Sequence, residues 1–167
     1  MVSEKEIYLK EVAKTQRGKM KKRLLEWGGA LELCKRKHEE IRKINHMIAD
    51  VKGLTVKRPL RVVSEHEHPV LESVIDYYTQ EIRRITEQIG EIMAEKQKME
   101  SLLEGLTAEE QEFIFLRYEK GYGYDYISLK IHMSRAQCFR VNDKALDKLI
   151  HRSYECIEGL KEEVAVM

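Results

Sequence analysis

Apolar residues recur in alternating steps of four and three along two long segments, over 20–48 and over 71–103. Such steps keep apolar side chains on one side of an α-helix and are typical of a coiled-coil seam. The pattern therefore predicts two long helices, over about 3–52 and 69–103. The stripe expected on the first helix consists of Met20, Leu24, Trp27, Leu31, Cys34, His38, Ile41, Asn45 and Ile48.

The segment between these helices, 53–68, is expected to be a linker. It begins at Gly53, contains Pro59 and is followed by Pro69, and both residue types favour a change of chain direction. The simplest arrangement is an antiparallel hairpin of the two helices. We therefore expect an all-α fold with a coiled-coil or oligomerisation region over 3–103.

The second apolar stripe is rich in isoleucine, which favours self-association. We expect a homo-oligomer, a dimer or a tetramer, that is held together by this stripe. The pattern leaves open whether the hairpin closes within one chain or between chains. The residues expected at the oligomer contact are Leu71, Ile75, Tyr78, Ile82, Ile85, Ile89 and Ile92.

Two adjacent glycines, Gly28 and Gly29, interrupt the first helical segment in the sequence WGGA. Each glycine inside a helix costs about 1 kcal/mol relative to alanine. The apolar stripe keeps its phase across them, so a continuous helix is favoured over a break. Close approach of another backbone and a local kink are the two interpretations, and we favour close packing.

The C-terminal part of the chain, 106–163, contains signals for shorter helices. Thr107 and Glu110 form a T-x-x-E capping box, which predicts a helix that starts at Ala108 and stops near Gly121. After it, Gly123 can cap a short helix over 124–131.

A tight turn at 132–134 follows, and Ser134 is expected to cap a longer helix over 134–150. A short helix, a tight turn and a longer helix are typical of a helix-turn-helix DNA-binding domain, in which the longer helix enters the major groove.

The longer helix has two chemically different faces. Its apolar residues Cys138, Val141, Ala145, Leu146 and Leu149 are expected to point inward. On the outward face, arginine can pair with guanine, glutamine with adenine, and alanine or phenylalanine can contact a thymine methyl group, while lysines meet phosphates. The residues predicted to contact DNA are Tyr126, Lys130, Ser134, Arg135, Ala136, Gln137, Phe139, Arg140, Lys144 and Lys148.

The segment EEQEFIFLRYEKGYGYDYISLKIHMSRAQCFRVNDKALDKL resembles region 4 of bacterial sigma factors. The residues that carry the resemblance are Leu116, Arg117, Tyr118, Gly121, Ile127, Ser134, Arg135, Cys138, Val141, Lys144, Ala145, Leu146, Lys148 and Leu149. A coiled-coil region before such a domain is similar to phage and prophage late transcriptional regulators of the ArpU type. The resemblance implies sequence-specific transcription regulation, with RNA polymerase as a further partner if the chain activates as sigma region 4 does.

Three residues depart from the family pattern. His132 stands at the turn position usually held by glycine, and it can adopt a left-handed conformation at some cost. Phe139 and Ala136 replace residues that are usually polar. A base preference different from that of a primary sigma factor is expected, and the absence of core-binding and promoter-melting regions argues against a complete sigma factor.

Composition limits the other possibilities. Charged residues make up 35% of the chain and the net charge is only +1, so any basic footprint for DNA must be local. One such concentration is KTQRGKMKKR at 14–23, with six basic residues and no acidic one. It is expected to be a solvated helix face or a contact for DNA phosphates or an acidic partner.

No motif predicts an enzyme, a cofactor or a metal site, since His66 and His68 lack further ligands nearby. Three widely spaced cysteines favour reduced thiols, and neither a signal peptide nor a membrane-spanning segment is evident. A cytoplasmic protein of a bacterial host cell, with double-stranded DNA as its partner, is expected.

Two alternatives remain open: a DNA-packaging adaptor similar to a phage terminase small subunit, and a coiled-coil interaction protein without DNA binding. A closed ring of subunits would favour packaging, and salt-sensitive DNA affinity would exclude the interaction protein. The expected position of the DNA-binding domain, after the helical region, favours regulation.

Overall fold

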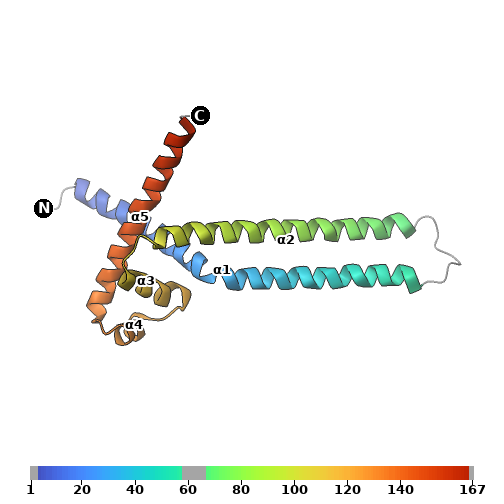
Figure 1. Ribbon diagram of the computed structural model, residues 1–167, viewed down its shortest axis with the longest axis horizontal. Helices are drawn as coiled ribbons and strands as arrows, with labels where there is room; N and C mark the ends of the chain where they lie inside the picture. The colour runs from blue at the N-terminus through green and yellow to red at the C-terminus, as the bar shows by residue number, and fades with distance from the viewer. Residues whose placement is uncertain (1–3, 58–66, 166–167) are drawn as a thin grey trace. The chain divides into compact units, whose positions relative to one another are not determined.

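The computed structural model describes the backbone of residues 4–57 and 67–165 and the side chains of 14–53 and 70–155. Every regular element within these residues is a helix, which confirms the all-α prediction (Figure 1). In chain order the elements are α1 (Glu4–Lys57), α2 (Glu67–Leu103), α3 (Ala108–Ile114), the π-helix η1 (Phe115–Glu119), α4 (Tyr124–Lys130) and α5 (Arg135–Ala165).

The two long helices have nearly the predicted bounds. One difference is that α1 continues through Gly53 to Lys57, so the first residues of the predicted linker are helical. A single glycine costs only about 1 kcal/mol in a helix, which a long helix tolerates. The expected breaker Pro69 lies in the first turn of α2, where its missing N–H is not needed. Pro59 lies outside the described residues.

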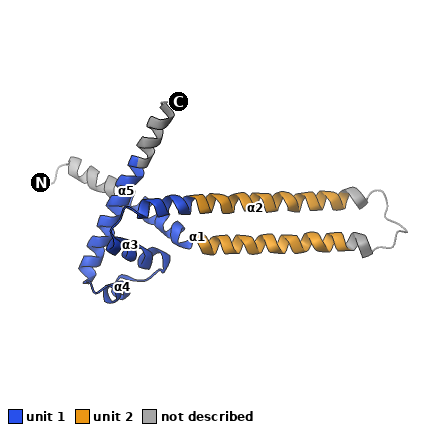
Figure 2. Cartoon of the chain, viewed as in Figure 1, with its two compact units in different colours: residues 1–29, 95–167 blue, residues 30–94 orange. Residues whose placement is uncertain are grey.

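The chain forms two compact units, and each long helix contributes to both of them (Figure 2). The first unit comprises Met1–Gly29 and Glu95–Met167, and the second unit comprises Ala30–Ala94. The shorter helices and α5 therefore share a unit with the N-terminal part of α1 and the C-terminal end of α2.

In the second unit, α1 and α2 run side by side in opposite directions (Figure 1). Lys37 Nζ donates a hydrogen bond to Gln88 Oε1 at 2.6 Å, and Ile85 is only 3% exposed within the single chain. The other six residues of the predicted oligomer contact are half-buried: Leu71, Ile75, Tyr78, Ile82, Ile89 and Ile92. The single chain therefore buries Ile85 and covers the other six residues in part, and self-association through this stripe stays a prediction.

The buried stripe on α1 differs from the expected one after Trp27. Leu31 is 49% exposed, and His38 and Asn45 are also exposed. Ala30 is instead buried, and Lys37 is half-buried. A heptad repeat allows a step of three or a step of four after Trp27. Spacing alone therefore does not decide whether Ala30 or Leu31 belongs to the buried row.

The two glycines of α1 have different environments in the first unit. A Cβ added to Gly28 would lie 2.1 Å from the carbonyl oxygen of Tyr118, whereas one added to Gly29 would meet nothing within 4 Å. The helix continues through both residues. Close backbone packing, the interpretation favoured from the sequence, is thus confirmed at Gly28 and does not apply to Gly29.

The first unit has one continuous hydrophobic core. Tyr118 and Asn142 form a buried polar link inside it, with a hydrogen bond of 3.0 Å from Tyr118 Oη to Asn142 Oδ1. Burial raises the pKa of Tyr118 to about 12, so its hydroxyl stays protonated and can donate. The buried members of the core are Met20, Leu24, Trp27, Met99, Leu102, Leu106, Phe113, Ile114, Leu116, Tyr118, Ile127, Cys138, Ala145, Leu146 and Leu149.

Candidate nucleic-acid interface

The capping box before α3 forms as expected, and its glutamate has a second role. Glu110 N–H donates to Thr107 Oγ1 at 3.3 Å, and Thr107 N–H donates to Glu110 Oε2 at 3.0 Å. Lys148 Nζ, from α5, donates to both carboxylate oxygens of Glu110 at 2.9 and 2.8 Å. Burial alone would raise the pKa of Glu110, but the hydrogen bonds from Lys148 and Thr107 outweigh burial and lower it.

This ion pair changes the position of one residue predicted to contact DNA. Lys148 is turned toward α3, and its side chain is 35% exposed. The neighbouring Lys144 lies 3.9 Å from Glu110 but keeps a side-chain exposure of 70%. Lys144 is therefore available to an external phosphate, while Lys148 is held by an internal carboxylate.

Two glycines lie between η1 and α4. The π-helix ends at its cap Lys120, and Gly121 follows with a φ of 71°, a left-handed conformation that suits glycine. Gly123 has extended backbone and caps α4, as expected from the sequence. Ile127 is completely buried and anchors this short helix in the core.

The turn between α4 and α5 contains a strained residue. His132 has a φ of 54°, as its place at a usual glycine position suggests. The turn is closed by a hydrogen bond of 3.0 Å from Met133 N–H to the Ser128 carbonyl oxygen. Cys138 N–H then bonds to the Ser134 carbonyl oxygen at 3.0 Å, which starts the helical ladder of α5.

Ser134 caps α5, and Gln137 completes a second capping box. Gln137 N–H donates to Ser134 Oγ at 3.2 Å, and Ser134 N–H donates to Gln137 Oε1 at 2.8 Å. The side-chain oxygen of Gln137 is thus occupied, and the bidentate pairing with adenine that the sequence suggested would need this cap to open. The spacing S-x-x-Q was the signal for this role.

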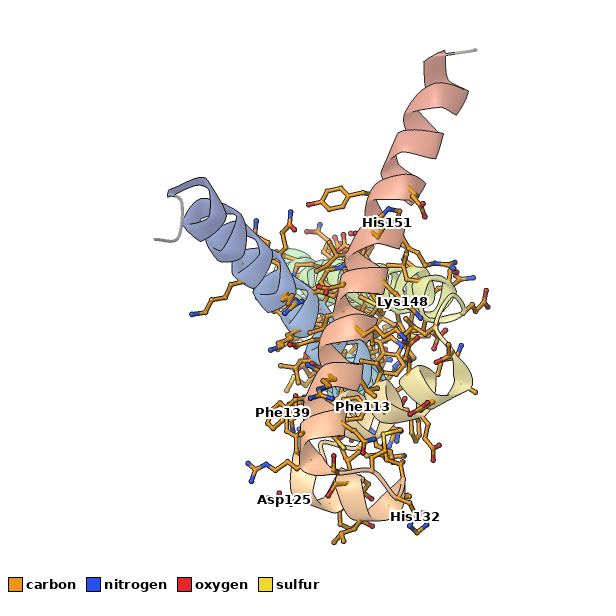
Figure 3. All side chains as sticks on the ribbon, turned by 90° about the vertical axis from the view of Figure 1, so that its left-hand side faces the viewer. Phe113, Asp125, His132, Phe139, Lys148 and His151 are labelled. Atoms are coloured by element: carbon orange, nitrogen blue, oxygen red, sulfur yellow. The ribbon has the colours of Figure 1, made fainter. Side chains whose placement is uncertain are left out.

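The first two turns of α5 expose most of the remaining predicted contact residues. Ala136 and Arg140 are exposed, and Phe139 is 45% exposed. Phe139 stacks on Tyr124, with 4.2 Å between the ring centres, so it is both a surface residue and a support for α4. Arg135 Nη1 lies 3.3 Å from Asp125 Oδ1, yet its side chain stays 63% exposed. Figure 3 labels Phe139 and Asp125 in this region.

The outer side of α4 extends this surface. Tyr126 is 51% exposed and Leu129 is 77% exposed. Lys130 Nζ lies 5.8 Å from the centre of the Tyr122 ring. Tyr126 and Lys130, two predicted contact residues, therefore share the outer side of α4 and are both accessible.

The N-terminal part of α1 packs against α5, which the sequence did not suggest. Arg17 Nε and Nη2 donate to the two carboxylate oxygens of Asp147 at 2.7 and 2.6 Å, and Arg17 Nη1 lies 3.3 Å from Asp143. These contacts, the Asp147 hydrogen bond first, raise the pKa of Arg17. Gln16 Nε2 also donates to Tyr154 Oη at 2.9 Å.

Metal ligands, thiols and membrane-spanning helices bear on other kinds of site. No group of three or more potential metal ligands occurs among the residues that the structure describes, and His66 and His68 lie outside the described side chains. Cys34 and Cys138 are buried free thiols, and burial raises the pKa of Cys138. No described helix is long and apolar enough to cross a membrane.

No family model, curated protein or solved structure matches this chain.

Proposed function

We propose that this chain is a sequence-specific DNA-binding transcription regulator. Helices α4 and α5 with the turn at His132 would form a helix-turn-helix, and the first two turns of α5 would enter the major groove. The observation that carries the proposal is the exposure of Arg135, Ala136, Phe139 and Arg140 on a helix start that Ser134 caps and Cys138 anchors in the core.

We propose different roles for the predicted contact residues, according to their exposure and their partners. Arg140 is exposed and suits a guanine contact, and Ala136 suits a thymine methyl group. Lys130 and Lys144 suit phosphates on either side of the groove. Lys148 is held by Glu110, and Gln137 by the cap of α5, so neither would be a primary contact.

Oligomerisation and partners are part of the same proposal. One helix-turn-helix makes few base contacts, so useful affinity would need two copies on a repeated or palindromic site. The long α1–α2 pair would act as a coiled coil that supports a dimer or tetramer. The resemblance to sigma region 4 and to ArpU-type regulators supports a phage or prophage role in the host cytoplasm, with RNA polymerase as a further partner.

A salt-dependent titration of the full-length protein against specific and scrambled duplexes tests the proposal. The specific duplex would come from selection of binding sequences out of a random pool. Arg140→Ala should weaken specific binding by about 1–3 kcal/mol and relax the preference at one base pair. Arg36→Ala, an exposed arginine of the second unit, is the matched control. Wild-type protein that selects no sequence and binds no duplex would contradict DNA binding, and a closed ring of subunits would favour a packaging adaptor.

A further inference from the structure

Helix α1 lies on the same side of α5 that carries the proposed reading residues. Ala136, Arg140, Asp143 and Asp147 follow one another at steps of four, three and four, so they share one side of α5. The last two of them bind Arg17 of α1. Among the described side chains, Ala136 and Arg140 are therefore exposed on this side of α5, and α1 contacts it at Asp143 and Asp147.

The dimensions of a helix and of the DNA major groove indicate where α1 would lie when α5 is bound. Asp143 lies only about 4.5 Å along the helix axis from Arg140, at 1.5 Å per residue. A helix with its side chains is about 10–12 Å in diameter, whereas the major groove is about 8.5 Å deep. Helix α1 would thus meet the edge of the groove, where the phosphates lie, when the first two turns of α5 are inside.

The side chains of α1 at this place are basic. Lys14 and Lys21 stand three residues before and four residues after Arg17, so all three share a side of the helix. Both lysines are exposed. The segment 14–23 contains no acidic residue, although the whole chain is nearly neutral. Its Arg17 lies against Asp143 and Asp147, directly after the proposed reading turns of α5.

We infer that α1 is a second part of the DNA interface, with Lys14 and Lys21 contacting the phosphates that flank the groove entered by α5. This inference rests on the proposed DNA binding. It also explains how an almost neutral chain can attract a polyanion, because the cations gather where the duplex lies.

Arg17 is the positioning residue of this interface. Without it, the carboxylates of Asp143 and Asp147 would stand uncompensated on the side of α5 that faces the duplex and would repel the phosphates. With it, both negative charges are matched, and α1 is fixed against the turns of α5 that directly follow the first two. Arg17 thus serves DNA binding without a contact to DNA of its own.

The first experiment measures how the DNA affinity of the full chain depends on salt. The double variant Lys14→Gln/Lys21→Gln should bind specific and scrambled duplexes more weakly to a similar degree. The slope of log K against log salt should become shallower by about two units, because each lost phosphate contact contributes about 0.9. The control Lys35→Gln/Lys43→Gln removes the same charge from the same helix in the second unit and should keep the wild-type slope.

The second experiment separates charge neutralisation from a purely structural role of Arg17. Arg17→Gln should weaken binding to all duplexes several-fold. Addition of Asp143→Asn and Asp147→Asn should restore most of this loss, because the repelling charges are then gone. A structural role alone predicts no restoration, since the triple variant also lacks the ion pairs. Circular dichroism reports whether each variant is folded.

The outcomes distinguish this inference from the proposed function. If Arg140→Ala weakens specific binding but Lys14→Gln/Lys21→Gln keeps the wild-type slope, α1 is not part of the interface and this inference is wrong. The same conclusion follows if the control pair lowers the slope equally. If wild-type protein binds no duplex at all, the proposed function fails and this inference fails with it.

Discussion

The first two turns of α5 and the turns that follow carry similar residues, but their environments differ. In the first two turns, Arg135, Phe139 and Arg140 are largely exposed. In the following turns, Asp143 and Asp147 bind Arg17 on one side, while Lys148 binds Glu110 on the other. A charged residue on an amphipathic helix is therefore not by itself a binding residue. Its availability depends on the partners that the fold brings to it.

The largest effect is expected when an arginine is placed on the buried side of α5 and, for comparison, on its exposed side. Cys138→Arg places a charge where the side chain is completely buried and should destabilise the first unit by at least about 3 kcal/mol, because the charge finds no partner. Ala136→Arg, two residues earlier on the exposed side, should leave stability almost unchanged. Thermal unfolding by circular dichroism measures both, and equal melting temperatures would show that Cys138 is not buried.

The two adjacent glycines of α1 provide the next largest contrast. Gly28→Ala should cost about 1–3 kcal/mol, because the added Cβ would clash with the carbonyl of Tyr118 and a backbone must move. Gly29→Ala meets no atom and should stabilise the helix by about 1 kcal/mol. Urea unfolding of the two variants measures whether their free energies of unfolding change in opposite directions. Stabilisation by both substitutions would contradict the close contact at Gly28.

A smaller effect is expected from pH, through Glu110. Its pKa is lowered in the folded chain, so ionised Glu110 contributes stability above its unfolded pKa of about 4.3, and this contribution is lost as pH falls through the folded pKa. Glu110→Gln should lower stability at neutral pH by about 1–3 kcal/mol and flatten the acid limb. Glu109→Gln, which is exposed, is the control. An unchanged acid limb in Glu110→Gln would place the acid sensitivity elsewhere.

The smallest expected effect concerns the difference between Lys144 and Lys148 of α5. Lys144→Ala should make the salt dependence of DNA binding shallower by roughly one unit. The double variant Lys148→Met/Glu110→Gln, which removes both charges of this ion pair, should keep the wild-type slope, because Lys148 is already neutralised by Glu110. Titrations at several salt concentrations compare the two. A larger change for the Lys148 variant would mean that this lysine leaves Glu110 to bind phosphate.

Much of the candidate site could be read from the sequence because its signals are local. The capping box at Thr107, the cap at Gly123 and the cap at Ser134 depend on residues within one turn of a helix, and all three occur as expected. The inward face of α5 followed from helical periodicity, and Cys138 is completely buried. Function itself does not follow from these local signals, and DNA binding stays a proposal.

Other features could not be predicted because they join residues that are distant along the chain. The pairs of Arg17 with Asp147 and of Lys148 with Glu110 span 130 and 38 positions. The sequence showed the charges but not their partners. The choice of Ala30 over Leu31 on α1 is similar, since both fit the heptad and only packing selects one of them.

The sequence by itself determined most of the helices, their caps and the apolar side of α5, because each depends on periodicity and on hydrogen bonds within a few residues. The buried row of α1 and the π-helix η1 did not follow from it. Only the tertiary structure decided which charges are free. Helix α1 contacts the later turns of α5 through Arg17, and α3 contacts them through Glu110. The physical reason is that an ion pair needs its two groups within a few ångströms, and over long stretches of chain only the packing of the core provides that distance.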